Sequence, residues 1–244
     1  HFKGRCVMSN ITSRVYKPSD FSEGLWHEVL VTLGKKGFSP EMAVEIMNTK
    51  SGKAAEIVSL FPQVLDTVSY WRNFYKDFCG LDVDFSKAKV SDLQGDFTRV
   101  LGIPQGLTPN RMYEACEKHF PCWHYTDDLD KATAGLNERE SAESYFVRVR
   151  DRVEADEEFR NTSADAIKGN GIKTETLLER LVHEGVFYHE TGEHLDIQNW
   201  TLCAGSRNTH GFVPHVSWRD GKMFVYWCDP QNAGDGLRAR AVVS

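Results

Sequence analysis

An Asp-Gly pair between two apolar runs is the feature that most constrains how this 244-residue chain can fold. A type I′ turn needs positive φ at both central residues, and Asp220-Gly221 tolerates that conformation, so the flanking runs are expected to form a β-hairpin. The turn places Arg219 opposite Lys222 and thereby sets the register of the whole hairpin. The expected pairs are Trp218 with Met223, Ser217 with Phe224, Val216 with Val225, His215 with Tyr226 and Pro214 with Trp227.

Alternation of side chains along this hairpin predicts one apolar face and one mixed face. The apolar face, expected in the core, carries Val216, Trp218, Met223, Val225 and Trp227. The candidate binding residues of the mixed face are His215, Arg219, Lys222, Phe224 and Tyr226, with Arg238 and Arg240 added if the last strand pairs alongside.

The mixed face has two interpretations. Aromatic rings flanked by cations on a sheet are typical of surfaces that stack the bases of single-stranded nucleic acid. Large aromatic side chains are more often buried, however, which favours a covered sheet. In that case Phe224 and Tyr226 pack under the acidic segment that follows Val149, and Arg238 and Arg240 pair with its carboxylates.

The first part of the chain predicts a helical module over residues 1–80 that includes a basic N-terminal arm over residues 1–19. Apolar residues recur at helical spacing, and Ser39-Pro40-Glu41 combines a side-chain cap, a preset φ and an acid in the first turn. Four helices joined by short turns are expected to form a small bundle. Residues 81–107 contain Gly95, Gly102, Pro104 and Gly106 and are interpreted as a connection.

Residues 108–244 predict an α+β module. A helix is expected from Thr108-Pro109, a strand over residues 145–149, and an amphipathic helix from Thr174 to Gly192 that Gly185 could divide. Strands at 200–204 and 237–242 join the hairpin in an expected antiparallel meander. The predicted fold is therefore α+β, with an N-terminal helical bundle and a C-terminal antiparallel sheet packed on helices.

Charge and hydropathy limit the classes of partner. The net charge of −6 argues against a general polyanion binder. No run approaches the roughly 18 apolar residues of a membrane helix, and no leader is recognisable, so a cytoplasmic protein without a membrane partner is expected. The six scattered cysteines are expected to be reduced and mostly buried.

Several runs in the last hundred residues resemble a family of uncharacterised bacterial proteins. They are Arg150–Glu158, Leu177–Leu181, Glu190–Asp196, Thr201–Arg207 and Leu237–Ser244, and the resemblance extends faintly to the helices between Phe21 and Phe61. It implies a bacterial protein and assigns no activity or functional residue.

The densest set of metal-capable side chains is Cys116, His119, Cys122 and His124. A structural zinc site needs four thiolate or imidazole ligands in a tetrahedron, but here all four lie close together with a non-standard spacing. The alternative is a helix end with a buried cysteine and a half-exposed histidine. Zinc is therefore retained only as a possible cofactor.

Other motifs give weaker indications. His189 and His194 are one residue too far apart for a zincin motif, because a spacing of five turns the two rings away from each other. Ser206 and Cys203 lie near His210 and His215 in sequence but lack a nucleophile-elbow context.

A helix-turn-helix within residues 39–61 would offer only Lys50 and Lys53 to DNA. The leading expectation from the sequence is therefore a non-enzymatic binding module for protein or single-stranded nucleic acid. The competing class is a metal-dependent or Cys/His hydrolase that uses residues 116–124 or 206–215.

Overall fold

The computed structural model describes residues 31, 35, 37–47 and 67–244. Two compact units share the chain, residues 1–65 and residues 66–244, so the boundary precedes the expected one at Gly80. In the first unit α2 spans Pro40–Met47, and the hydroxyl of Ser39 accepts a hydrogen bond from the Met42 amide at 3.4 Å. The predicted start of that helix is confirmed. The basic arm and the other helices of the predicted N-terminal bundle lie outside the described residues, except for the last predicted helix, which overlaps the second unit.

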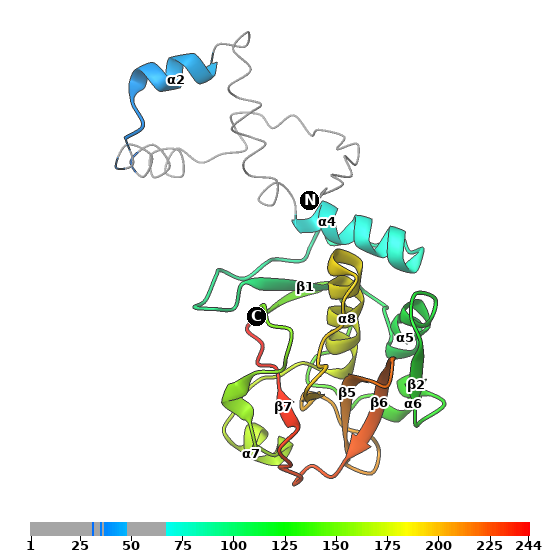
Figure 1. The fold of residues 1–244 in the computed structure, drawn as a ribbon. Coiled ribbons are helices and arrows are strands. Elements are labelled where there is room, and N and C mark those ends of the chain that lie inside the picture. Colours follow the sequence, from blue (N-terminus) through cyan, green and yellow to red (C-terminus); the bar gives the residue numbers. More distant parts are fainter. Residues whose placement is uncertain (1–30, 32–34, 36, 48–66) are drawn as a thin grey trace. The chain divides into compact units, whose positions relative to one another are not determined.

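The second unit is α+β, as predicted, and is built on a five-stranded sheet of order β2-β6-β5-β4-β7 (Figure 1). Its strands are β2 (Cys122–His124), β4 (Trp200–Leu202), β5 (Val213–Arg219), β6 (Lys222–Cys228) and β7 (Leu237–Ala239). A separate antiparallel ribbon pairs β1 (Arg99–Ile103) with β3 (Tyr145–Val149). The helices are α4 (Thr67–Phe74), the π-helical turn η2 (Tyr75–Cys79), α5 (Pro109–Glu117), α6 (Leu129–Thr133), the 3₁₀ turn η3 (Glu157–Phe159), α7 (Ala164–Gly169) and α8 (Leu177–Thr191).

The predicted register of the hairpin is confirmed, but two of the five residues expected in the core, Trp218 and Trp227, are only half-buried. All the predicted pairs of β5 and β6 are present, from Pro214 with Trp227 to Arg219 with Lys222. Asp220 and Gly221 have φ values of 51° and 74°, as a type I′ turn requires. Val216, Met223 and Val225 are buried on the predicted core face.

The antiparallel meander is only partly correct. Strands β4, β5 and β6 are antiparallel, but β7 pairs with β4 in parallel and β2 pairs with β6 in parallel. The chain after β6 crosses to the far edge of the sheet before β7 begins, so β7 does not lie beside the hairpin. The sheet is therefore mixed, with a parallel pair at each edge.

Helix α8 occupies the centre of this unit and contacts α5, β1 and β5. It begins at a capping box formed by Thr176 and Glu179, two residues after the expected Thr174, and ends at Gly192 in the left-handed conformation. Gly185 does not divide it. The glycine leaves room for neighbouring side chains, since a Cβ at that position would lie 2.5 Å from Cε of Met112 and 3.1 Å from Cε1 of Phe78. Helix α8 can therefore pack closely against its neighbours.

The outer face of the sheet, opposite α8, is divided between a covered and an open part. Phe159 of η3 and Ile167 of α7 form a buried cluster with Leu202, Val213 and Leu237. This cluster covers the side of the face toward β4 and β7. The acidic segment thus covers the sheet as the second interpretation expected, but only over that side.

Residues 81–107 are not a bare connection. They contain β1, and Phe85, Leu101 and Ile103 are buried in the main core. Tyr75 donates a hydrogen bond from its hydroxyl to the Gly102 carbonyl at 2.7 Å. This segment is therefore part of the second unit, where it packs against the residues that follow α4, and does not link two modules.

Gly102 gives a test of this packing. A Cβ at Gly102 would lie 2.8 Å from Cε1 of Phe146 and 2.9 Å from Cγ of Trp71, and both rings are buried. Gly102→Ala should therefore lower the free energy of unfolding by about 1 to 3 kcal/mol, measured by urea denaturation. Gly169→Ala, where the added Cβ meets nothing within 4 Å, is the control and should be neutral or slightly stabilising.

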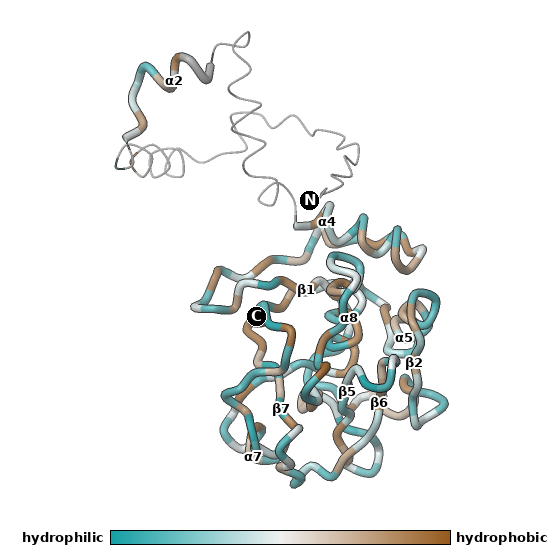
Figure 2. Tube along the Cα trace, in the orientation of Figure 1, coloured by the Kyte–Doolittle hydropathy of each residue, from teal (hydrophilic) through white to brown (hydrophobic). Residues whose placement is uncertain are grey.

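A cluster of buried charges connects α8 to the sheet. Figure 2 shows hydrophilic as well as hydrophobic residues along α8, although its residues from Leu177 to Phe187 are buried. Asp196 accepts hydrogen bonds from Arg180 Nε at 3.0 Å, from Arg240 Nη2 at 2.6 Å, from the Ala155 amide at 2.9 Å and from the Thr201 hydroxyl. Burial raises the pKa of Asp196, but the two arginines lower it further, so the carboxylate stays ionised.

A second buried pair lies beside this cluster. His183 Nδ1 and Glu175 Oε1 are 2.8 Å apart, and both side chains are fully buried. Burial raises the pKa of Glu175 to about 8 and lowers the pKa of His183 well below its ordinary value. Burial therefore favours the uncharged form of both groups, in contrast to the charged groups around Asp196.

None of the helices in the described ranges is long and apolar enough to cross a membrane.

Candidate functional site

The open part of the outer face carries a series of aromatic rings drawn from four strands. The hairpin contributes His215, Phe224 and Tyr226 by the alternation expected from its register. Strand β2 places Trp123 opposite Phe224, and β4 contributes Trp200. Tyr125, which follows β2, is held beside the hairpin because its amide donates to the Val225 carbonyl at 3.1 Å. We call these six residues the aromatic face.

Neighbouring rings of the aromatic face are in contact across the strands. The rings of Trp200 and His215 are nearly parallel, with centroids 5.4 Å apart and an angle of 14° between planes. Trp123 and Tyr226 form a second near-parallel pair, with centroids 5.9 Å apart and an angle of 15°. His215 and Tyr226 connect the two pairs at 5.8 Å, and Tyr125 lies 4.9 Å from Tyr226. The rings therefore form a continuous series.

Much of this series is open to solvent. Trp123 is 39% exposed, Tyr226 41% and Tyr125 63%, whereas Trp200, His215 and Phe224 are half-buried. Exposed apolar groups gathered on one face commonly mark a binding surface, whereas single exposed apolar residues need no explanation. The covered-sheet interpretation is therefore wrong for Tyr226 and does not describe this side of the face.

Arg219 stands at the edge of the aromatic face. Its Cζ lies 5.9 Å from the ring centroid of Trp200 and 5.8 Å from that of Phe224. Its ion pair with Asp220, at 3.4 Å, joins side chains that are 59% and 75% exposed, so water screens it strongly. The guanidinium is consequently available to an anionic group of a ligand that contacts the rings.

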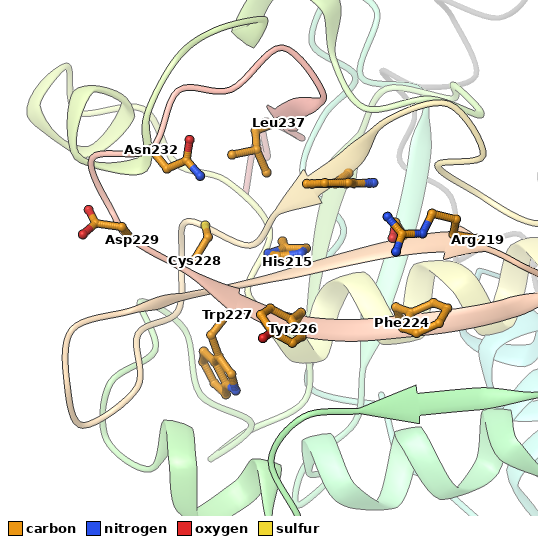
Figure 3. Close-up of a pocket in the computed structure, with 11 residues that line it drawn as sticks. His215, Arg219, Phe224, Tyr226, Trp227, Cys228, Asp229, Asn232 and Leu237 are labelled. Carbon is orange, nitrogen blue, oxygen red and sulfur yellow. The ribbon is translucent and has the colours of Figure 1, made fainter.

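A cavity of about 410 Å³ opens on this face (Figure 3). Trp200, His215 and Tyr226 contribute rings to its lining, Arg219 and Phe224 lie at one end, and Asn232 lies near the other. Burial and the nearby Arg219 lower the pKa of His215 to about 4, so its imidazole is neutral near pH 7. His215 therefore presents a flat neutral ring to the cavity.

The sequence-predicted binding residues separate into two groups. His215, Arg219, Phe224 and Tyr226 line the cavity, and Lys222 is exposed at the end of the hairpin without lining it.

The expectation that Arg238 and Arg240 join the outer face is wrong. Because β7 pairs with β4, the two strands β4 and β5 separate it from β6. Arg240 is buried and binds Asp196 and the carbonyls of Arg152 and Val153, and Arg238 forms an ion pair with Glu157. The pairing of Arg238 with the acidic segment is as the covered-sheet interpretation expected.

The four candidate zinc ligands are directed to different partners. Cys116 is buried, with Sγ 3.9 Å from the Leu181 carbonyl. His119 stacks on Phe78, its ring nitrogen 3.0 Å from the carbonyl of that residue.

Cys122 Sγ lies 3.4 Å from the Phe120 carbonyl, and His124 Nδ1 lies 2.5 Å from the Thr126 carbonyl. Across the part of the chain that the structure describes, no group of three His, Cys, Asp or Glu side chains is arranged to hold a metal ion. The structure does not bring the four residues together.

The candidate hydrolase residues have structural partners. Ser206 is buried, accepts a hydrogen bond from the Leu177 amide at 2.9 Å and donates one to Asn137 Oδ1 at 2.6 Å. Burial raises the pKa of the Cys203 thiol well above its ordinary value, which disfavours the nucleophilic thiolate. Ser206 therefore supports the start of α8 rather than facing His215 across a cleft.

Sequence reasoning missed Trp123, Tyr125, Trp200 and Asn232. The run from Cys122 to Tyr125 alternates aromatic residues with others at the period of a strand, which is a sign of the first two. Their position beside the hairpin depends on a parallel pairing between distant segments, and a short run does not specify it. Comparisons with known proteins found no protein-family model, curated protein or solved structure that matches this chain.

Proposed function

We propose that the chain is a non-enzymatic binding module for single-stranded nucleic acid, and that the ligand lies across the aromatic face. The observation that carries the proposal is the partly exposed series of rings from Tyr125 to Trp200 with Arg219 at its edge. Unpaired bases stack on exposed aromatic side chains, and each stacked base contributes about 1 to 3 kcal/mol. A cation beside the rings supplies a contact to the connecting phosphate.

The cavity supports an unpaired ligand rather than a duplex. A base in a duplex is already stacked on its neighbours and presents only its edge, so it cannot lie on a protein ring without leaving the helix. The aromatic face offers ring surfaces and a cavity of about 410 Å³, which is in the usual size range of small-ligand sites. Such a surface is suited to the unpaired bases of a single strand, which can leave their neighbours and stack on the protein rings.

The charge of the chain predicts binding that depends weakly on salt. Arg219 and Lys222 are the exposed cations of the hairpin, and the net charge of the chain is −6. Each phosphate contact by a single strand contributes about −0.7 to the slope of log K against log salt, so two contacts give roughly −1.4. Stacking, rather than counterion release, therefore supplies most of the binding free energy in this proposal.

A filter-binding assay with single-stranded oligonucleotides at low and moderate salt tests the proposal. Tyr226→Ala should weaken binding by about 5- to 150-fold, because it removes the ring that contacts Trp123, Tyr125 and His215. Phe212→Ala is the matched control, since Phe212 is equally exposed, at 41%, and does not line the cavity. The control should bind like the unchanged chain.

Two results would contradict the proposal. One is the absence of oligonucleotide retention at low salt. The other is an equal loss of binding in Tyr226→Ala and Phe212→Ala, which would indicate that no particular surface is involved. Circular dichroism of both variants should match that of the unchanged chain, because Tyr226 lies on the open side of the sheet and contributes little to the core.

A further inference from the structure

One end of the cavity presents hydrogen-bond donors to a ligand. Asn232 Oδ1 accepts a hydrogen bond from the Gly234 amide at 3.0 Å, which identifies the oxygen of this side chain and leaves its Nδ2 group for a ligand. Figure 3 shows the amide nitrogen of Asn232 directed toward the interior of the site, on the side of Cys228. Burial raises the pKa of Cys228 to about 11, so its thiol stays protonated and is a weak donor.

The Asp229 carboxylate lies near this end of the cavity but does not present a hydrogen-bond acceptor to it. Asp229 Oδ1 accepts a hydrogen bond from the Gln231 amide at 2.8 Å, and Figure 3 shows the carboxylate directed away from the rings. The loop is held by its own backbone, since the Asn232 amide donates to the Asp229 carbonyl at 3.0 Å and the Leu237 amide donates to the Gly234 carbonyl at 2.9 Å. These bonds, together with the one from the Gly234 amide to Asn232 Oδ1, restrain the exposed side chain of Asn232.

We infer that this cavity selects one base of the strand by a keto group, to which Asn232 Nδ2 donates a hydrogen bond while the base stacks on the neighbouring rings. Uracil and thymine carry a carbonyl oxygen at the position where cytosine carries an amino group, and guanine and adenine differ in the same way. An amino group there would meet the donor of Asn232 and leave both groups without an acceptor. This inference rests on the proposed function and adds a base preference to it.

Short homopolymers of uridylate and cytidylate test the selection, because their bases have the same size and differ at this edge. The unchanged chain should bind oligouridylate about 3- to 10-fold more tightly than oligocytidylate, as expected for one hydrogen bond. Asn232→Asp keeps the oxygen that accepts from Gly234 and replaces the donor with an acceptor. In this variant the ratio of the two affinities should fall to one or invert.

Asn208→Asp is the matched control for the added charge. Asn208 Oδ1 accepts hydrogen bonds from the His210 and Phe212 amides at 2.9 Å, so the substitution also preserves a turn, and Asn208 does not line the cavity. Its affinities for the two homopolymers should keep the ratio of the unchanged chain, even if both are weakened by the extra charge.

The results separate this inference from the proposed function. Equal affinities of the unchanged chain for both homopolymers, with binding still weakened by Tyr226→Ala, would overturn the base preference and leave nucleic-acid binding supported. An unchanged ratio in Asn232→Asp would overturn the role of Asn232. Failure of the unchanged chain to bind either homopolymer at low salt would overturn both proposals.

Discussion

Replacement of Asp196 by alanine should lower the free energy of unfolding by about 3 to 5 kcal/mol. The carboxylate is fully buried and receives hydrogen bonds from Arg180 at 3.0 Å and Arg240 at 2.6 Å. Its removal leaves two guanidinium groups in the core without the anion between them, although Glu184 still pairs with Arg180 at 2.9 Å. Urea denaturation of the variant and of the unchanged chain measures the difference.

An exposed aspartate paired with arginine supplies the control. Asp151 accepts a hydrogen bond from Arg99 at 2.7 Å, but its side chain is 57% exposed. Asp151→Ala should change the free energy of unfolding by less than about 1 kcal/mol, because the lost carboxylate is solvent-exposed and Arg99 keeps its ion pair with Glu190 at 2.8 Å. Equal losses in the two variants would show that burial of Asp196 does not determine its contribution.

Replacement of Glu175 by glutamine should make the folded state more stable, and the gain should grow with pH. Burial raises the pKa of Glu175 from 4.5 to about 8, so the folded chain retains a proton that the unfolded chain releases. The unchanged chain therefore loses stability as pH rises from about 4.5 to about 8 and loses no more above that range. At pH values above this range, the full pKa shift corresponds to a loss of roughly 5 kcal/mol in the free energy of unfolding.

The measurement is the difference in unfolding free energy between Glu175→Gln and the unchanged chain from pH 5 to pH 9. Arg240 and Arg180 lower the pKa of this carboxyl and Glu179 and Asp196 raise it, but burial is the largest cause of the shift. Glutamine has no proton to release at this position, so the difference between the two chains follows the titration of Glu175. Glu158→Gln is the control, and its effect on the free energy of unfolding should have the opposite sign. Arg152 lowers the pKa of that half-exposed carboxylate to about 2, so the carboxylate stabilises the folded state. Parallel stability curves for Glu175→Gln and the unchanged chain would contradict the prediction.

Local signals in the sequence predicted the elements whose geometry is local. The hairpin register followed from Asp220-Gly221 alone, since a two-residue turn sets the pairing of both strands. The helix starts at Ser39 and at Thr108-Pro109 were predicted because the start of a helix depends on neighbouring residues. Strand β3 followed from alternation over five residues.

The parts that the sequence did not predict depend on contacts between distant segments. The parallel pairings of β2 with β6 and of β4 with β7 leave no local pattern in either strand. Arg240 alternates with apolar residues as a surface arginine would, and only the position of Asp196 accounts for its burial. Likewise, four of the candidate binding residues predicted from the sequence line the cavity. The positions of Trp123 and Asn232 could not be predicted, because they depend on the assembled sheet and on the loop that follows β6.

The origin of the aromatic face in separate strands links ligand affinity to the completion of folding. The hairpin can form early because its contacts are local, whereas β2 reaches it from a distant part of the chain and pairs more slowly. Trp123 therefore joins the hairpin rings only after the sheet closes. A ligand that requires all of these rings recognises the finished domain alone and stabilises it by mass action, so its concentration also determines how much of the chain stays folded.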